Sequence, residues 1–144
     1  MRKIAIGSDH AGYQHKEKIS SWLRNNQIDV LDFGVFSEDP VDYPDVVHPL
    51  CNCIENDEKV SGILLCGSGN GVAMTANKHP YIRAALCWNV EIAILAKKHN
   101  DANVICLPAR FINFETAIDI IIAYFKTEFE GGRHSNRIKK IPLA

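Results

Sequence analysis

The sequence has 144 residues, which is the length of one domain able to bury a hydrophobic core of its own. Hydrophobic residues make up 47% of the chain and charged residues 23%, the usual balance of a soluble globular protein. The formal net charge of -1 offers no overall attraction to nucleic acid or to an anionic membrane, so neither is expected as a partner. Any site for an anion must therefore be local.

We expect neither a targeting segment nor a membrane span. The first residues, MRKIAIGSDHAG, contain too short an apolar stretch for a signal peptide, and no stretch reaches the roughly 18 consecutive apolar residues of a membrane span. We therefore expect a cytoplasmic protein. Five cysteines is an odd number, and Cys66, Cys87 and Cys106 lie in or beside apolar runs, as reduced core thiols do. No structural disulfide is predicted.

Five short apolar runs predict strands buried on both faces: 3–7, 28–33, 62–66, 82–86 and 103–107. Stretches with the apolar spacing of helices lie between these runs and after the last one: 13–26, 41–56, 70–77, 90–99 and 114–129. Strands and helices alternate throughout. This alternation predicts an α/β fold with a five-stranded parallel sheet.

No internal repeat, low-complexity tract or linker divides the sequence, so residues 1–144 are expected to form a single domain. The composition changes at Glu130, Gly131 and Gly132, because the stretch RHSNRIKKI that follows is basic and has few residues that would join a core. We expect this C-terminal tail, residues 131–144, either to fray or to dock on another surface.

The loop CGSGNG, residues 66–71, follows the third predicted strand and leads into a helix. In an open parallel sheet, ligands bind beyond the carboxyl ends of the strands, where such loops lie. The loop matches neither the dinucleotide-binding pattern G-x-G-x-x-G nor a P-loop, which requires Gly-Lys-Ser/Thr. Its main-chain N–H groups from Gly67 to Gly71 can instead point at one oxygen anion. The alternative is a tight turn in which the glycines only let the helix pack on the sheet.

Cys66 stands at the entrance of this loop, among unpaired N–H groups at the start of a helix. A thiol in such a position loses its proton more readily than a free thiol and can act as a base or a nucleophile. The alternative is a buried and inert thiol. Ser68 places a hydroxyl on the same loop and can pass protons between neighbouring substrate oxygens. Asp9 and His10 follow the first predicted strand, where such a pair is typical of a site.

Three arginines indicate a phosphate site. Arg133 and Arg137 are four residues apart, so on a helical turn they share a face and repel each other unless an anion lies between them. Phosphate suits such a pair, and Arg110 after the fifth strand can join it. A solvated basic tail is the alternative. His99, followed by Asn100, closes a predicted helix, where a histidine either serves a site or interacts with the helix dipole.

Two further groups of polar residues have ordinary structural explanations. Asp45 in DYPD is either a helix N-cap or a functional carboxylate. Cys51, Cys53 and His48 can be drawn as three metal ligands, but no second half of a metal site accompanies them. Two thiols with different facings on one helix explain this pattern, so no metal site is predicted.

Taken together, the motifs resemble the ribose-5-phosphate isomerase B family of sugar-phosphate isomerases, which also includes the galactose-6-phosphate isomerase subunits. The stretches that carry the resemblance occur in order over nearly the whole chain: GSDHAG (7–12), DYPD (42–45), CGSGNGVAMTANK (66–78), IRAALC (82–87), HNDANV (99–104) and GGRHSNRIKKI (131–141). The resemblance implies a Rossmann-like, three-layer α/β/α sandwich that forms a homodimer with shared active sites, or a tetramer.

The same resemblance implies an aldose–ketose isomerase of the non-oxidative pentose phosphate pathway. Such an enzyme interconverts ribose 5-phosphate and ribulose 5-phosphate through an enediolate, without a metal or an organic cofactor. Asn70 departs from the family pattern, which often has an apolar residue at this position. The choice therefore stays open between a pentose phosphate and a hexose 6-phosphate such as allose or galactose 6-phosphate. A non-catalytic module that binds a phosphorylated metabolite is the alternative from a different class of function.

The resemblance also implies roles for individual residues. Cys66 resembles the base that moves a proton between C2 and C1 of the sugar, and Ser68 stands where the family usually has threonine. His99 resembles the acid that opens the sugar ring. The other matched positions are implied to bind the sugar, its phosphate or the enediolate: Asp9, His10, Tyr43, Gly67, Gly69, Asn70, Gly71, Asn100, Arg110, Arg133 and Arg137. The basic tail is implied to dock on the partner subunit.

Overall fold

Strands and helices alternate along residues 2–143, the part of the chain that the computed structural model describes. The elements are β1 (Lys3–Ser8), α1 (Tyr13–Asn25), β2 (Asp29–Asp32), α2 (Tyr43–Asn56), β3 (Val60–Cys66), α3 (Asn70–Ala76), β4 (Ala84–Leu86), α4 (Val90–Asn100), β5 (Val104–Pro108), α5 (Phe114–Lys126) and α6 (Arg133–Lys139). All neighbouring strands pair in parallel, in the order β2-β1-β3-β5-β4. The predicted α/β fold with a five-stranded parallel sheet is confirmed.

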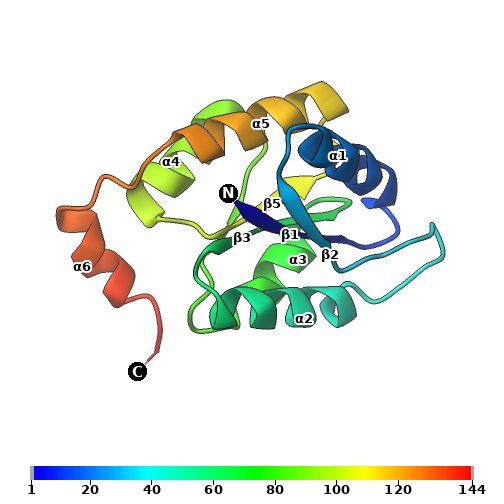
Figure 1. Ribbon diagram of the computed structural model, residues 1–144. Helices are drawn as coiled ribbons and strands as arrows, with labels where there is room; N and C mark the ends of the chain where they lie inside the picture. Colours follow the sequence, from blue (N-terminus) through cyan, green and yellow to red (C-terminus); the bar gives the residue numbers. More distant parts are fainter. Residues whose placement is uncertain (1, 144) are drawn as a thin grey trace.

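The sheet lies between two layers of helices (Figure 1). Helices α1, α4 and α5 cover one face, and α2 and α3 cover the other. Successive residues of a strand point to opposite faces, so Ile63 and Leu65 of β3 join one core, whereas Leu64 and Cys66 join the other. Each core is built mainly from aliphatic side chains. The expected three-layer α/β/α sandwich is therefore confirmed.

The two edge strands differ from the prediction of strands buried on both faces. Strands β1, β3 and β5 are buried almost throughout, whereas β2 alternates between exposed and half-buried residues and β4 is half-buried. Each edge strand has a neighbouring strand on one side only, and Leu31 of β2 stays 38% exposed. The prediction is wrong for these two strands, because an apolar run does not reveal whether a strand lies at an edge.

Helix α2 begins two residues later than the sequence pattern indicated, at Tyr43. Pro44 lies in its first turn, where the missing N–H of proline needs no partner. The N-cap is Asp42, so the alternative in which Asp45 caps the helix is wrong. This start places Tyr43 near the carboxyl edge of the sheet, beside the glycine loop.

The C-terminal tail forms helix α6, which packs against α4 and lies apart from the sheet (Figure 1). His134 is the buried residue of this helix. The segment before it is held to α4, because the main-chain N–H of Glu130 donates to the carbonyl oxygen of Lys98 at 3.0 Å. Residues 133–139 therefore do not fray.

Candidate active site

A cleft of about 540 Å³ opens at the carboxyl edge of the sheet. The segments after β1, β3 and β5 and the start of α2 line it: Asp9, His10, Ala11, Tyr43, Cys66, Gly67, Ser68, Gly71, Arg110 and Phe111. Many of the predicted site residues thus lie together where open parallel sheets bind ligands. Phe111 was not among the predicted residues. Its place directly after Arg110, in the loop that follows β5, is the signal that would have indicated it.

The glycine loop turns sharply at Gly69, whose φ of +78° lies in the left-handed region. A Cβ atom at this position would lie 2.4 Å from Cδ1 of Leu86, so only glycine fits. The turn brings the main-chain N–H of Gly69 back to Sγ of Cys66, to which it donates at 3.1 Å. The bond fixes the position of the sulfur at the entrance of the loop.

Other N–H groups of the loop remain available to a ligand. Within residues 2–143, the N–H groups of Gly67, Ser68 and Gly71 donate to no protein acceptor, although all three residues line the cleft. The N–H of Asn70 donates to Oγ of Ser68 at 3.2 Å, and the N–H of Gly69 is taken by Cys66. The donors that remain free in the predicted anion site are thus the N–H groups of Gly67, Ser68 and Gly71.

Tyr43 packs directly on the loop at Gly71. A Cβ atom at Gly71 would lie 2.6 Å from Cζ of the Tyr43 ring and 2.9 Å from its hydroxyl oxygen. The absence of a side chain at Gly71 therefore lets the Tyr43 ring and hydroxyl approach the loop closely. Gly69 and Asn70, which were predicted to bind substrate, shape the loop but do not line the cleft.

Asp9 and His10 enter the cleft with fixed orientations. Oδ1 of Asp9 accepts from the N–H groups of Ala11 and Gly12, at 2.9 and 3.1 Å, which leaves Oδ2 for a ligand. The N–H of Val41 donates to Nδ1 of His10 at 3.3 Å. Because Nδ1 accepts this bond, the proton of a neutral His10 ring resides on Nε2. The cleft thus receives one carboxylate oxygen and one ring N–H donor.

Arg110 provides the positive charge of the cleft. Its main-chain N–H donates to the carbonyl oxygen of Gly67 at 3.0 Å, which holds the loop after β5 against the glycine loop. A Cβ atom at Gly67 would lie 3.2 Å from Nη1 of Arg110, so the guanidinium lies over that residue. No ion pair formed within residues 2–143 involves Arg110. Its charge is therefore free to bind an anion.

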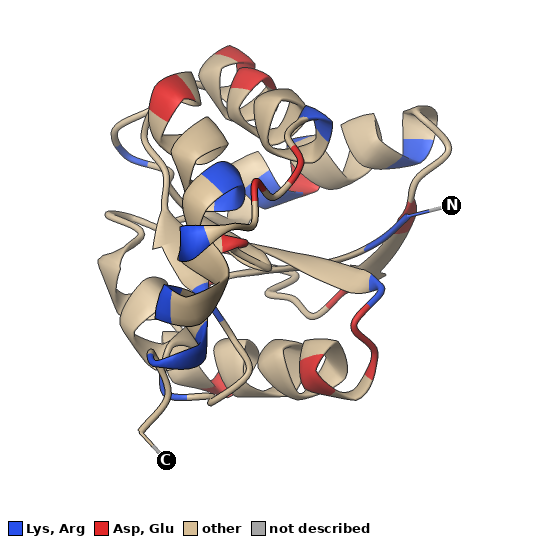
Figure 2. Ribbon diagram, turned by 90° about the vertical axis from the view of Figure 1, so that its left-hand side faces the viewer, with Lys and Arg blue, Asp and Glu red and all other residues tan. Residues whose placement is uncertain are grey.

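The remaining predicted residues, His99, Asn100, Arg133 and Arg137, lie at the opposite edge of the sheet. Helix α4 ends at Asn100, shortly before β5 begins, and α6 packs beside it (Figure 1). Figure 2, turned by 90° so that α6 faces the viewer, shows basic residues along this helix. β3 has seven residues, and a strand rises about 3.3 Å per residue, which separates the edges by roughly 20 Å. One chain therefore does not bring this group to the cleft.

His99 and His134 form a stacked pair at this second location. Their ring centroids lie 4.4 Å apart with an interplanar angle of 13°. Burial and the neighbouring His99 lower the pKa of His134, so its ring is neutral near pH 7. Neither His134 nor Glu130, whose carboxylate lies beside both rings, was a predicted site residue. Their spacing of four residues on the tail is the signal that would have paired them.

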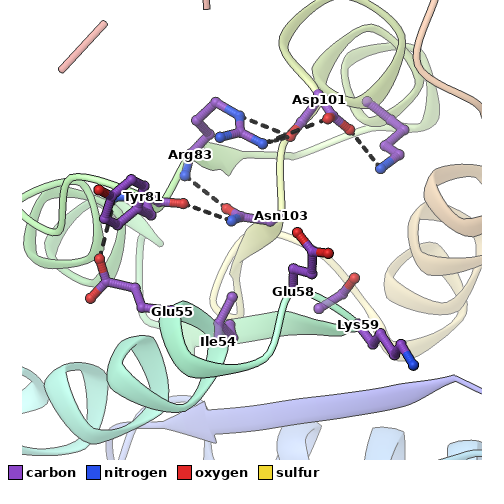
Figure 3. A pocket seen from close by; sticks show the side chains of 10 residues that line it. Ile54, Glu55, Glu58, Lys59, Tyr81, Arg83, Asp101 and Asn103 are labelled. Carbon is purple, nitrogen blue, oxygen red and sulfur yellow. Dashed lines mark hydrogen bonds and ion pairs between the residues drawn. The ribbon is translucent and has the colours of Figure 1, made fainter. Parts of the chain in front are cut away.

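In a second large cleft, of about 550 Å³, the lining residues form hydrogen bonds and ion pairs with one another (Figure 3). Nε and Nη2 of Arg83 donate to the carbonyl oxygen of Asp101 at 3.0 and 2.8 Å. Oδ1 of Asn103 accepts from the N–H of Arg83, and its Nδ2 donates to the carbonyl oxygen of Tyr81. None of the predicted site residues lines this cleft. Its polar groups hold β4 and the end of α4 to β5 and serve the fold.

The thiols apart from Cys66 show no arrangement for chemistry. All five cysteines are free, in agreement with the prediction of no disulfide. Burial raises the pKa of Cys51 and of Cys87 to about 12 and raises that of Cys106 well above its usual value. Among residues 2–143, Cys51, Cys53 and His48 do not converge into a group of metal ligands.

None of the helices described between residues 2 and 143 is both long and apolar enough to cross a bilayer.

The family model and the similar solved structures identify the same protein family. The model of the Ribose/Galactose Isomerase family matches residues 4–141. The crystal structure of a ribose 5-phosphate isomerase from Thermotoga maritima superposes with a TM-score of 0.96 at 46% sequence identity, covering 98% of this chain and 97% of that one. Ribose-5-phosphate isomerase B from Mycoplasma genitalium, solved with bound ribulose-5-phosphate, superposes with a TM-score of 0.92 at 42% sequence identity. This match covers 96% of this chain and 93% of that one.

One relative is named for a different sugar. The D-erythrulose-4-phosphate isomerase of Pectobacterium atrosepticum is 41% identical over 143 residues, which are 98% of this chain and 93% of that protein. The reaction type is shared by these relatives, whereas the sugar differs. The chain belongs to the ribose/galactose isomerase family and is an enzyme of the sugar-phosphate isomerase type.

Proposed function

We propose that this enzyme interconverts ribose 5-phosphate and ribulose 5-phosphate through an enediolate. The observation that carries the proposal is the position of the Cys66 thiol in one cleft with the unpaired N–H groups of Gly67, Ser68 and Gly71. Isomerisation of an aldose requires a base beside the carbon next to the carbonyl, and donors for the negative charge that forms. The substrate is carried over from two relatives named for ribose 5-phosphate.

In the proposed reaction, C1 and C2 of the open-chain sugar lie against Sγ of Cys66. The thiolate takes the proton from C2, the electron pair of that bond forms the C1–C2 double bond, and the oxygen on C1 becomes negative. The free N–H groups of the loop stabilise this oxygen. The thiol then returns the proton to C1, while the oxygen on C2 loses its proton and becomes the ketone.

Ser68 is suited to move the proton between the two sugar oxygens. Its Oγ accepts from the N–H of Asn70 at 3.2 Å, which fixes the hydroxyl and leaves its own hydrogen free to be donated. A second lone pair of Oγ can accept the proton of the C2 hydroxyl. We therefore assign Ser68 the proton transfer from the oxygen on C2 to the oxygen on C1.

We further propose that two copies of the chain share each site. His99, Asn100, Arg133 and Arg137 lie at the edge opposite the cleft, so a partner chain has to supply them as the ring-opening acid and as sugar and phosphate ligands. Arg110 of the first chain would complete the phosphate site.

An exposed apolar surface supports this homodimer. Met74 on α3 is 67% exposed, Trp88 before α4 is 51% exposed, and Leu95 on α4 is 43% exposed. These elements flank the edge strand β4, which has a strand partner on one side only. Covering such side chains removes apolar area from water, which favours association.

The substrate assignment is tested by kcat/KM with several sugar phosphates. We expect ribose 5-phosphate to exceed allose 6-phosphate and galactose 6-phosphate by about 10-fold or more, because an additional carbon has to fit the same cleft. D-erythrulose 4-phosphate is the second candidate, since the Pectobacterium relative is named for it. A higher kcat/KM for another sugar would reassign the substrate. Phosphate-dependent binding without turnover of any of them would instead indicate the non-catalytic module.

A further inference from the structure

Three potential metal ligands converge beside α4, at the edge of the sheet away from the cleft. His99 is the penultimate residue of α4, Glu130 lies between α5 and α6, and His134 is in the first turn of α6. Nε2 of His99 lies 3.9 Å from Oε2 of Glu130, and Nε2 of His134 lies 3.9 Å from Oε1 of the same carboxylate. All three ligand atoms lie within 4.8 Å of one another.

These separations suit an ion between the ligands better than direct hydrogen bonds. A distance of 3.9 Å is too long for a hydrogen bond between an imidazole and a carboxylate. Nitrogen and carboxylate ligands bind Zn²⁺ at roughly 2.0 to 2.2 Å, so two ligands of one ion lie roughly 3 to 4 Å apart. The carboxylate already meets this spacing with both rings. His99 and Glu130 are 39% and 48% exposed, which leaves them room to close further.

His134 provides an independent indication of a ligand. Its side chain is only 8% exposed, and its Nε2 atom is buried without a hydrogen-bond partner among residues 2–143. A buried polar atom without a partner costs free energy, so it calls for a bound group that satisfies it. The nitrogen is on the side of the ring that meets Glu130, where a cation would provide that partner.

The backbone holds the three ligands in place. The N–H of Glu130 donates to the carbonyl oxygen of Lys98 at 3.0 Å, which fixes Glu130 beside the end of α4. The N–H of His134 donates to the carbonyl oxygen of Gly131 at 3.2 Å, which fixes the start of α6. The rings of His99 and His134 are stacked at an interplanar angle of 13°. Because an imidazole binds an ion in its ring plane, the partly exposed His99 ring has to turn before both nitrogens reach one ion.

We propose that His99, Glu130 and His134 of one chain bind a divalent transition metal ion of the Zn²⁺ class. Two imidazole nitrogens and one carboxylate oxygen form a usual donor set for Zn²⁺, with a fourth position left for water or an anion. The ion takes no part in the isomerisation. It binds the ring of His99, the proposed ring-opening acid, so it acts as an inhibitor. This inhibition rests on the proposed function, whereas metal binding does not.

Neighbouring cationic side chains weaken metal binding at this site. Removing one of them should therefore raise the metal affinity, whereas removing a ligand should lower it. Nζ of Lys98 lies 3.9 Å from Oε2 of Glu130 and competes with the metal ion for this oxygen. Arg133 and Arg137 add positive charge to the surroundings of His134. Replacing Lys98 with glutamine should therefore tighten metal binding, whereas replacing Glu130 with glutamine should weaken it.

Binding is measured by titrating the full chain with Co²⁺ and Zn²⁺ in phosphate-free buffer, with a metal indicator as competitor. We expect one ion per chain and a visible Co²⁺ spectrum without the thiolate charge-transfer band that cysteine ligands give. Glu130→Gln should weaken the affinity by about 10-fold or more. The matched control is Glu128→Gln, an exposed carboxylate two residues away, which should bind like the wild type. Lys98→Gln should bind more tightly.

Equal Zn²⁺ affinity in the Glu130→Gln and Glu128→Gln proteins would overturn the proposal, as would a thiolate band in the Co²⁺ spectrum. His134→Gln gives a second measurement and should also weaken binding by about 10-fold or more. The thermal melting of each variant shows that it is folded. Binding is read without substrate, so a protein that binds Zn²⁺ through these residues but turns over no sugar phosphate would contradict the proposed function alone.

Discussion

The main-chain N–H of Gly69 donates a hydrogen bond of 3.1 Å to Sγ of Cys66, across the sharp turn that ends β3. This bond fixes the position of the sulfur, which belongs to the lining of the cleft. Because only glycine fits at position 69, the geometry of the turn and the chemistry of the thiol depend on one another. The adjacent free N–H groups of Gly67 and Ser68 then lie beside the reactive sulfur.

Replacing Cys66 with alanine should lower kcat for ribose 5-phosphate by about 10² to 10⁴-fold, because the proposed base is lost. Cys66→Ser should be similarly impaired, since a hydroxyl is a far weaker base than a thiolate at neutral pH. Cys53→Ala, a change at a half-buried thiol of α2 that does not line the cleft, serves as the control and should retain activity. Steady-state kinetics give kcat for each variant. A kcat close to that of the wild type in Cys66→Ala would show that Cys66 is not the base.

Gly69→Ala should destabilise the protein by about 1–3 kcal/mol through the left-handed φ, and by more through the collision with Leu86. Gly131 has a similar positive φ, of 72°, and a Cβ atom there would have only Oγ of Ser135 nearby, at 3.9 Å. Gly131→Ala therefore measures the cost of the positive φ without a collision. Urea unfolding of both variants gives the difference. If Gly69→Ala costs no more than Gly131→Ala, the packing against Leu86 is not what restricts position 69.

Inactive chains should complement one another if two copies share each site. Cys66→Ala and Arg137→Ala proteins should each be impaired alone. Random mixing after refolding yields heterodimers in which one site carries both changes and the other carries none, so about a quarter of all sites are intact. Activity of the mixture should therefore rise to about this fraction of the wild-type value. A mixture no more active than its components would place the complete site within one chain.

Lys16 is fully buried, and its Nζ lies 2.9 and 2.8 Å from the two carboxylate oxygens of Asp32. Oδ1 of Asp32 also accepts from the N–H of Gly34, so the pair anchors the loop that leads to Tyr43. Lys16→Met leaves the Asp32 charge largely buried without its partner and should cost about 3–5 kcal/mol. The exposed Lys18→Met is the matched control, expected within about 0.5 kcal/mol of the wild type.

Urea unfolding checks these values, and the combination with Asp32→Asn isolates the ion pair. Removing the charge of Asp32 should recover part of the stability lost in Lys16→Met, because no unpaired charge then stays buried. Strictly additive losses would show that the two side chains do not stabilise one another.

Stability should fall at alkaline pH because of the buried thiols. Burial raises the pKa of Cys87 from 9.0 to about 12, so the folded state keeps a proton that the unfolded state releases. Its contribution is complete below about pH 9 and is lost as the pH rises towards 12, by at most about 1.4 kcal/mol per pH unit. Urea unfolding between pH 8 and 11 measures this slope. Cys87→Ala should make the dependence of the unfolding free energy on pH shallower. An unchanged slope would show that groups other than Cys87 cause the loss of stability.

Local sequence patterns predict much of the fold. Apolar runs located all five strands, because the central strands of a parallel sheet are buried on both faces. The edge positions of β2 and β4 do not follow from such runs, since they depend on the order in which strands pair. Helix α6 was expected only as a basic tail, because its stability comes from packing against α4 and not from an apolar stripe of its own.

The candidate site was predictable to the extent that chain order fixes position in a parallel sheet. Residues just after a strand, such as Asp9 and Cys66, meet at the carboxyl edge. Which N–H groups of the loop remain free depends on the exact turn at Gly69, which no spacing rule gives. The pairing of Glu130 with His99 joins segments distant in sequence, so only the folded chain brings them together.

The unpaired donors at Gly67, Ser68 and Gly71 belong to the main chain, and this affects how the site tolerates mutation. A substitution exchanges a side chain but leaves the N–H in place, and only proline removes it. Drift in sequence can therefore alter the rim of the cleft, at Tyr43 or Phe111, without deleting these charge-stabilising groups. A new sugar preference can thus arise from changes at the rim while the proton-transfer apparatus is inherited intact.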